Sequence, residues 1–231
     1  MKDYKHVFFD LDRTLWDFET NSFETLSELA HKYKISERGV VSLDEFISRY
    51  VKINEVMWDK YRKGLIDKNT LRYQRFHEIF ENYGITDRKL IENFGNDYLS
   101  VSPLKTKLFP HCVEVLHYLN QKYSLHIITN GFEEVQHIKI KNCGIGHYFE
   151  HIITSERSGF KKPDLRIFQY SMDVVNAKTS NSIMIGDSLE ADIVGARNAG
   201  IHQVFFNPCG DVHTEEVTYE IKSLKELTNF L

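Results

Sequence analysis

KHVFFDLDRT, residues 5–14, joins a short apolar run to two carboxylates. The run predicts a strand over residues 5–9 that is apolar on both faces, which is typical of a strand covered by helices on each side. The strand ends at once in Asp10 and Asp12. Because ligands of an open parallel sheet bind beyond the carboxyl ends of its strands, a site is expected at this end of the strand.

The second half of the chain alternates apolar strand patterns with helical patterns. Strands are predicted at residues 125–129, 151–154, 182–186 and 203–206, and helices at residues 110–122, 133–143, 164–175 and 189–199. A last helix at residues 223–230 opens with a capping box of Ser223 and Glu226. This alternation predicts an α/β fold, a Rossmann-like parallel sheet with helices on both faces and right-handed crossovers.

The intervening residues have the spacing of helices. One face of the first helix is predicted from apolar residues three or four positions apart: Phe23, Leu26, Ala30 and Tyr33. A capping box at residues 42–45 opens a long helix that Gly64 can close, and two more helices are predicted near residues 69–83 and 87–99. Two domains are therefore expected: a core of residues 1–15 and 104–231, and an inserted all-helical domain of residues 16–103.

Charge and composition argue against several classes of protein. Basic side chains number 29 and acidic ones 33, a net charge of −4, which provides no broad positive field for a nucleic-acid polymer. The 3 cysteines form no C-x-x-C pair, and the 11 histidines show no metal-ligand spacing, so no zinc is implied. No signal-peptide pattern is seen, nor an apolar run of the roughly 20 residues that a membrane helix needs. We expect a cytoplasmic protein without a membrane partner, either a monomer or a homodimer.

Polar side chains follow four of the predicted strands. They are Asp10 and Asp12, then Thr129, Asn130 and Gly131, then Lys162, and finally Asp187 and Asp192. Each alone could serve a turn or a helix cap. Together, at the carboxyl ends of strands in one sheet, they predict a single site.

The chemistry of these groups favours phosphoryl transfer. Asp10 is a carboxylate nucleophile that can form an aspartyl-phosphate. Asp12 is placed to protonate the leaving alcohol and then to activate water. A phosphomonoester and several carboxylates need a cation between them, so Mg²⁺ bound by Asp10 and Asp187 is expected.

Two further groups are predicted to bind the phosphate. Lys162 supplies a positive charge that also keeps Asp10 ionised, and the Thr129 hydroxyl acts together with the Asn130–Gly131 segment. Asp192 has two interpretations. It is an indirect contact of the metal, or only a carboxylate that suits the dipole of the helix that follows.

The residues described above belong to four motifs: residues 10–14 (DLDRT), 128–130 (ITN), 162–164 (KPD) and 186–192 (GDSLEAD). These motifs resemble those of the haloacid dehalogenase-like hydrolases, and the resemblance covers the whole chain. The resemblance implies that the carbonyl oxygen of Asp12 completes the metal ligands. It also implies that Lys162, which directly precedes proline, is the family's lysine, with Lys161 as a solvated neighbour. The helical insertion then corresponds to a mobile cap that closes over the site and carries substrate specificity.

Within this family, residues 54–64 and 128–132 are similar to the pyrimidine 5′-nucleotidases. The predicted function is a Mg²⁺-dependent phosphatase acting on pyrimidine nucleoside monophosphates. The alternative is a sugar-phosphate phosphatase or a β-phosphoglucomutase-like phosphomutase, which would use the same motifs. A dehalogenase fits less well, since Asp12 has no use when the leaving group is a halide. A phosphoacceptor signalling domain would lack the helical insertion.

Candidate substrate-binding residues are also predicted within the insertion. Asn54, Trp58 and Tyr61 share one helix face, where Trp58 can stack on a pyrimidine and Asn54 can bond its edge. Arg75 can reach a phosphate or sugar oxygen. Another interpretation stays open, in which Trp58 and Tyr61 form the core of the helical domain and Arg75 only ties the two domains together.

Overall fold

The computed structural model describes residues 3–231 and divides the chain into two compact units. The sheet unit contains the residues up to Phe18 together with Thr106–Leu231, and the helical unit is Glu19–Lys105. The boundaries therefore fall at 18/19 and 105/106, where the sequence patterns place them at 15/16 and 103/104. Within residues 3–231, none of the helices combines the length and the apolar character that a bilayer crossing requires.

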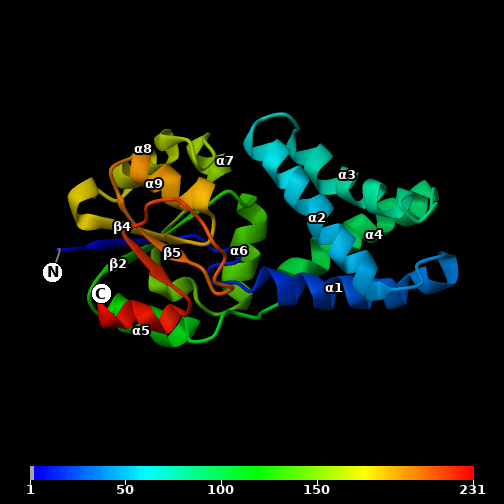
Figure 1. Ribbon diagram of the computed structural model, residues 1–231, viewed down its shortest axis with the longest axis horizontal. Helices are drawn as coiled ribbons and strands as arrows, with labels where there is room; N and C mark the ends of the chain where they lie inside the picture. Colours follow the sequence, from blue (N-terminus) through cyan, green and yellow to red (C-terminus); the bar gives the residue numbers. More distant parts are fainter. Residues whose placement is uncertain (1–2) are drawn as a thin grey trace. The chain divides into compact units, whose positions relative to one another are not determined.

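Six strands form one sheet in the described part of the chain (Figure 1). They are β1 (His6–Phe9), β2 (Ser124–Thr129), β3 (Phe149–Thr154), β4 (Ser182–Gly186), β5 (His202–Phe206) and β6 (Tyr219–Ile221). The order is β3-β2-β1-β4-β5-β6, and every neighbouring pair is parallel. The predicted Rossmann-like α/β fold is confirmed. Only β6, which has 3 residues, escaped prediction because so short a strand shows no pattern.

Helices cover both faces of the sheet. They are α5 (Cys112–Asn120), α6 (Glu133–Asn142), α7 (Ser155–Ser158), α8 (Leu165–Val174) and α9 (Gly195–Asn198). Val7 and Phe9 of β1 belong to one apolar cluster with Leu116 of α5, whereas Phe8 belongs to another with Phe168 of α8. Successive residues of β1 thus enter opposite layers, which explains its unbroken apolar run.

Two of the predicted helices differ from regular α-helices. The helix predicted at residues 189–199 is a π-helical turn, Leu189–Val194, followed by α9. The Ile193 N–H donates to the Ser188 carbonyl oxygen five residues earlier, which is the hydrogen bond of a π-turn. The helix predicted at residues 223–230 is a 3₁₀-helix, Leu224–Asn229, although its capping box of Ser223 and Glu226 does form.

Long α-helices make up the helical unit, and most of them start at capped positions. They are α1, which begins in the preceding unit (Phe18–Lys32), α2 (Leu43–Arg62), α3 (Lys68–Glu81) and α4 (Arg88–Val101). The side chains of Ser42, Asp67 and Asp87 each accept a bond from the backbone N–H three residues later, at the starts of α2, α3 and α4. After α2 the chain turns at Gly64, whose φ of 70° suits a residue that closes a helix.

The core of the helical unit is largely aromatic. Rings of Phe46, Tyr50, Phe76, Phe80 and Phe94 lie in it, with neighbouring ring centroids 5.1 to 6.3 Å apart. The face predicted for α1 is wrong at Phe23, which is 46% exposed. Near the start of α1 the buried positions are polar ones, Asn21, Ser22 and Thr25, so apolar spacing alone misplaces the buried face there.

Candidate active site

The register of the strands brings several of their carboxyl ends to one edge of the sheet. Phe9, the last residue of β1, is level with Ile127 in β2 and Ile185 in β4. Asp10 therefore follows β1 at the point where both neighbouring strands also end. Its backbone N–H donates to the Ile185 carbonyl oxygen at 2.9 Å, which anchors Asp10 beside β4.

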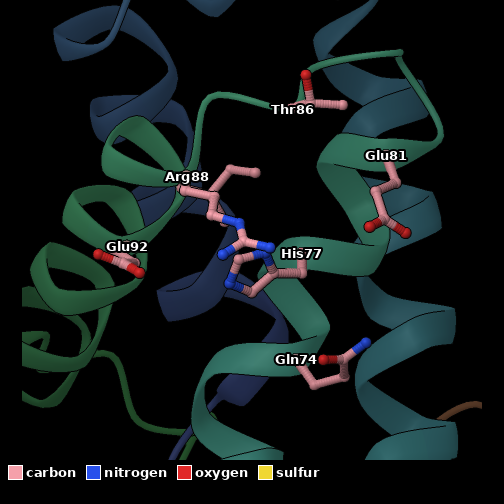
Figure 2. A pocket seen from close by; sticks show the side chains of 7 residues that line it. Gln74, His77, Glu81, Thr86, Arg88 and Glu92 are labelled. Atoms are coloured by element: carbon pink, nitrogen blue, oxygen red, sulfur yellow. The ribbon is translucent and has the colours of Figure 1, made fainter.

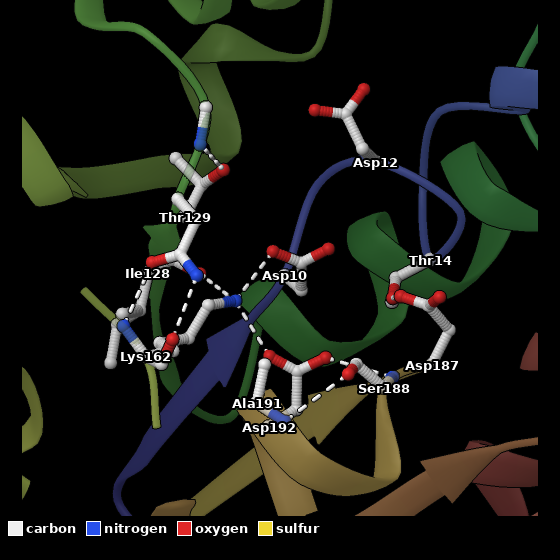
Figure 3. A network of polar contacts seen from close by, with 12 residues as sticks. Asp10, Asp12, Thr14, Ile128, Thr129, Lys162, Asp187, Ser188, Ala191 and Asp192 are labelled. Atoms are coloured by element: carbon white, nitrogen blue, oxygen red, sulfur yellow. Dashed lines mark hydrogen bonds and ion pairs between the residues drawn. The ribbon is translucent and has the colours of Figure 1, made fainter. Parts of the chain in front are cut away.

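Lys162 lies at the centre of the site (Figure 3). Its ammonium donates to Asp10 Oδ1 at 2.6 Å, to Asp192 Oδ1 at 2.6 Å and to the Ile128 carbonyl oxygen at 2.8 Å. The three hydrogens of the ammonium are thus all used, and the side chain is 2% exposed. A cation at this depth requires such partners, so Lys162 and the two carboxylates form one unit.

Asn130 places this lysine. Its Nδ2 donates to the Lys162 carbonyl oxygen at 2.9 Å, and its Oδ1 accepts from the Lys162 backbone N–H at 2.8 Å. This pair of bonds fixes the loop before α8 against the end of β2, so that Lys162 rather than Lys161 reaches Asp10. Asn130 was predicted to bind substrate, and in the structure both polar ends of its side chain hold the lysine backbone.

Three carboxylates gather at this edge. Ligand oxygens of Asp10, Asp187 and Asp192 all lie within 4.8 Å of one another. Gly186 makes room for them, since a Cβ there would lie 2.3 Å from Asp192 Oδ2. The Thr14 hydroxyl donates to Asp187 Oδ1 at 3.2 Å and so orients that carboxylate. Hard oxygen donors in this number suit Mg²⁺.

The structure brings three of the four aspartates predicted around the metal into one cluster. Asp192, predicted as an indirect contact of the metal or a helix-end carboxylate, has an oxygen in the same cluster as those of Asp10 and Asp187. The Asp192 side chain also accepts from the Ser188 N–H at 3.0 Å and from Lys162. The carboxylate of Asp12 lies outside this cluster, which leaves its carbonyl oxygen as the atom that the family resemblance assigns to the metal.

The electrostatics of the cluster favour a bound cation. Burial raises the pKa of Asp10 to about 7, with Lys162 opposing the rise and the charges of Asp192 and Asp12 adding to it. Burial also raises the pKa of Asp187 well above its ordinary range, and the other two carboxylates of the cluster reinforce this. Burial alone would lower the pKa of Lys162, but Asp10 and Asp192 outweigh it and raise that pKa. One lysine does not neutralise three carboxylates, two of them buried and the third half-buried.

Asp12 lies to one side, and its carboxylate points away from that of Asp10 (Figure 3). Gln136 Nε2 donates to Asp12 Oδ2 at 2.7 Å, and the Lys139 ammonium forms an ion pair with Asp12 Oδ1. Both partners come from α6 and are buried. Neither residue is predicted from the sequence, because a glutamine and a lysine three positions apart on a polar helix look like part of a solvated face. The sequence feature that could have indicated them is their position on the helix that directly follows the strand ending at Thr129.

Thr129 completes the same network. Its Oγ1 accepts from Gln136 Nε2 at 2.8 Å and from the Gly131 N–H at 3.0 Å. A Cβ at Gly131 would lie 1.9 Å from Gln136 Nε2, so a glycine is needed there for the glutamine to fit. Gly131 was predicted to bind substrate, and in the structure its N–H is engaged by Thr129.

The substrate-binding residues predicted in the helical unit contact other residues of the same unit. Arg75 Nη1 donates to Asn54 Oδ1 at 2.7 Å, and both side chains are buried. The guanidinium lies over the ring of Phe76 at 5.1 Å, and its Nε has no hydrogen-bond partner. Trp58 is partly buried and packs edge-on against Tyr61, with ring centroids 5.7 Å apart. Asn54 and Arg75 thus contact each other rather than presenting both groups outward.

A groove in the helical unit is a separate feature (Figure 2). Its volume is about 510 Å³, and its lining comes from α3, α4 and the loop between them. Side chains of mixed charge line it, among them Gln74, His77, Glu81 and Arg88. None of the predicted site residues belongs to this lining, and its polar groups share no chemistry that would select a ligand.

Comparisons with known proteins agree with the geometry of the sheet unit. A family model described as haloacid dehalogenase-like hydrolase matches residues 4–200. The chain is 31% identical to pyrimidine 5′-nucleotidase YjjG of Escherichia coli, over 97% of this chain and 96% of that protein. It is 30% identical to a glyceraldehyde 3-phosphate phosphatase of Methanothermobacter thermautotrophicus, over 88% of this chain and 85% of that protein.

A solved structure has the same fold over nearly the whole chain. YfnB from Bacillus subtilis, crystallised with magnesium bound, matches with a TM-score of 0.88 and 26% identity, over 99% of this chain and 98% of that one. The family match also includes all four motifs at the strand ends. The sequence-based prediction of the family is thus confirmed, and this enzyme belongs to the haloacid dehalogenase-like hydrolases.

Proposed function

We propose that this chain is a Mg²⁺-dependent phosphomonoester hydrolase that forms an aspartyl-phosphate at Asp10 and acts on pyrimidine nucleoside monophosphates. The observation that carries the proposal is the Asp10 carboxylate at the end of β1. Lys162 holds it at 2.6 Å, and it lies within 4.8 Å of Asp187 and Asp192. A carboxylate with a cationic partner and a set of oxygen donors around it is equipped both to bind a metal ion and to attack phosphorus.

The first step is attack by Asp10 on the phosphate ester. Lys162 holds Oδ1, so we assign the attack to Oδ2. The Oδ2–P bond forms, the bond between phosphorus and the alcohol oxygen breaks, and that oxygen takes a proton from Asp12. In the second step Asp12 accepts a proton from water, the water oxygen bonds to phosphorus, and the Oδ2–P bond breaks. Inorganic phosphate leaves, and Asp10 is restored.

The remaining residues orient these groups. Asp10 and Asp187 would hold Mg²⁺ through carboxylate oxygens, with the Asp12 carbonyl oxygen as a third protein ligand and Asp192 beside them. When bound, Mg²⁺ would neutralise part of the charge that a phosphate dianion brings to the cluster. Because all three hydrogens of the Lys162 ammonium are engaged, its proposed part is to keep Asp10 ionised and oriented.

The substrate class rests on the relatives and on the helical unit. The relative YjjG is a pyrimidine 5′-nucleotidase, and the resemblance noted in the sequence of residues 54–64 is to the same group. We assign substrate specificity to the helical unit, with Trp58 as the residue that meets the base. A sugar-phosphate phosphatase is the second candidate, favoured by the similarity to a glyceraldehyde 3-phosphate phosphatase.

A phosphate-release panel tests the proposal. Nucleoside monophosphates, sugar phosphates and an aryl phosphate would be compared with Mg²⁺ and with EDTA, using wild type, Asp10→Asn and the control Asp173→Asn, an exposed aspartate of α8. We expect Mg²⁺-dependent release led by pyrimidine nucleotides, a loss of roughly 10³-fold or more in kcat for Asp10→Asn, and wild-type rates for Asp173→Asn. Mass spectrometry of acid-quenched reactions should find a phosphorylated protein in wild type but not in Asp10→Asn.

Other outcomes would replace parts of the proposal. Release from sugar phosphates alone would favour the second candidate, and isomerisation of a sugar phosphate without release would indicate a phosphomutase. Wild-type turnover by Asp10→Asn would overturn the mechanism.

A further inference from the structure

We propose that Gln136 and Lys139 of α6 are positioning residues, which together fix the Asp12 carboxylate and turn the Thr129 hydroxyl into an obligate hydrogen-bond donor. We call this pair the α6 clamp. The inference rests on the proposed function, because it concerns how the general acid/base and the phosphate-binding hydroxyl of that reaction are held.

The α6 clamp engages both oxygens of Asp12. Gln136 Nε2 donates to Oδ2 at 2.7 Å, and Lys139 pairs with Oδ1. A bond to one oxygen would leave the carboxylate free to turn about its last torsion, whereas bonds to both fix the plane of the group. The Lys139 side chain is 7% exposed and that of Asp12 is 28% exposed. Lys139, which holds the carboxylate, is therefore the more buried member of the pair.

Lys139 is itself held in place. Its ammonium lies 3.9 Å from the centroid of the Trp16 ring, and Trp16 is fully buried. An apolar side chain would cover this ring without the desolvation that burying an ammonium requires. Asp12 supplies the negative charge that offsets this desolvation. We infer that a lysine stands here because of its contact with Asp12.

The contacts of Gln136 with Asp12 and Thr129 leave one of its own polar atoms without a hydrogen bond. Its Oε1 is buried and has no hydrogen-bond partner, while its Nε2 donates to both Asp12 and Thr129. Flipping the amide would turn Oε1, which can only accept hydrogen bonds, towards Asp12 Oδ2, the oxygen that accepts the bond from Nε2. The Asp12 carboxylate therefore determines which way the amide points, and the unpartnered oxygen follows from that orientation.

The orientation of Gln136 determines what Thr129 can do. Thr129 Oγ1 accepts from Gln136 at 2.8 Å and from the Gly131 N–H at 3.0 Å. A hydroxyl oxygen has two acceptor positions, and both are then occupied. Its one hydrogen is left to donate to a third group, and a phosphate oxygen is such an acceptor. One amide thus links the proposed acid/base to the proposed phosphate-binding hydroxyl.

A comparison of leaving groups separates positioning from mere packing. The value of kcat/KM reports only the steps up to the first irreversible one, here the transfer of the phosphoryl group to Asp10. A nucleoside monophosphate has an alkoxide leaving group that needs a proton, whereas 2,4-dinitrophenyl phosphate has one that does not. A defect in Asp12 orientation should therefore appear with uridine monophosphate and be small with the dinitrophenyl ester. A general packing defect should appear with both.

For Lys139→Met we expect kcat/KM towards uridine monophosphate to fall about 10- to 100-fold, with less than about a threefold change for 2,4-dinitrophenyl phosphate. Lys139→Arg, which keeps the charge, should recover part of this loss. The matched control is Lys141→Met, the same change at an exposed lysine of the same helix, and it should behave as wild type. In an Asp12→Asn background, Lys139→Met should add no further loss, because the two residues act as one unit.

Gln136→Met should raise KM about 10-fold for both substrates, since Thr129 loses its fixed donor direction. It should also lower kcat/KM for uridine monophosphate by a further factor of about 10 to 100, which the dinitrophenyl ester does not show. Thermal unfolding of every variant would show whether it folds. If Lys139→Met and Gln136→Met slowed both substrates equally, or slowed neither, the inference would be wrong. In either case a selective loss in Asp12→Asn would leave the proposed function intact. A wild-type enzyme inactive on both esters would instead overturn the proposed function.

Discussion

Buried charges in this chain find their partners far away in the sequence. Lys162 contacts Asp10, 152 residues earlier, and Asp192, 30 residues later. The free energy needed to bury each of these groups is offset only when all of them are present. Removing either carboxylate would leave part of a buried cation uncompensated, so these residues depend on one another for stability as well as for chemistry.

His126 is a buried group of a different kind, an imidazole among other imidazoles. It is fully buried in β2, with its Nε2 3.1 Å from His6 Nδ1 and its ring centroid 5.6 Å from that of His151. Burial, helped by the two neighbouring histidines, lowers the pKa of His126 to about 3. The folded state therefore excludes a proton that the unfolded chain binds below its ordinary pKa of 6.5.

We expect the free energy of unfolding to fall as the pH drops below about 6.5, with a slope that approaches roughly 1.4 kcal/mol per pH unit for this group. The contribution of His126 is complete above that pH and is lost progressively towards pH 3. Urea unfolding at several pH values would measure this, and His126→Leu should flatten the dependence between pH 6.5 and 5. His137→Leu, at an exposed histidine of α6, should keep the wild-type slope. The same slope in both variants would contradict the assignment.

At the next scale, the end of β4 and the turn after it act as one structural element. The strand ends at Gly186, and the Ser188 side chain accepts from the Ala191 N–H at 3.1 Å to open the π-helical turn. The Ser188 N–H in turn donates to Asp192 Oδ2 at 3.0 Å. The turn therefore brings Asp192 back over the strand end that precedes it. π-Helical turns of this kind are frequent at functional sites.

Gly186→Ala should disturb this element. The added Cβ would lie 2.3 Å from Asp192 Oδ2, so Asp192 must move and its contact with Lys162 must weaken. We expect a loss of about 1 to 3 kcal/mol in the free energy of unfolding and of at least roughly 10-fold in kcat. Denaturant unfolding and phosphate release would measure both. Gly146→Ala, whose Cβ would meet only Ile140 Cγ2 at 3.3 Å, is the control, and equal behaviour of the two variants would count against this account.

At the scale of the whole molecule, the two units divide the candidate residues between them. Asp10, Asp12, Lys162 and Asp187 all lie in the sheet unit, whereas Trp58 lies in the helical unit. Each unit has an apolar core of its own. An insertion with its own core can change its surface without moving the strand ends, which is why we assign chemistry to one unit and specificity to the other.

Trp58→Ala tests this division. Loss of a stacking surface should raise KM for pyrimidine nucleoside monophosphates about 10-fold and leave KM for a small aryl phosphate within about twofold. Steady-state kinetics would measure both, with Val56→Ala as the control because Val56 is an exposed residue of the same helix. A similar rise for both substrates would favour the interpretation of Trp58 as part of the core of the helical unit.

Much of the fold was predictable because its signals are local. A parallel strand buried on both faces must be apolar at consecutive positions, as β1 is, and the helices begin at side chains such as Ser42 that cap their first turn. Because ligands bind at the strand ends, the positions of Asp10, Thr129, Lys162 and Asp187 also followed from the order of the strands. The π-helical turn and the 3₁₀-helix near the C-terminus were not predicted from the sequence. Over so few residues their apolar spacing is the same as that of an α-helix.

Local sequence was thus sufficient for the five longer strands, the capped helix starts and the family, since backbone conformation and apolar periodicity depend on near neighbours. Only tertiary packing decided which polar groups meet. It buried Gln136 and Lys139 against Asp12 across 124 and 127 residues, and it paired Arg75 with Asn54 inside the helical unit. A polar residue is compatible with either solvent or a buried partner. Its burial is favourable only where the fold supplies that partner, and a one-dimensional pattern contains no such information.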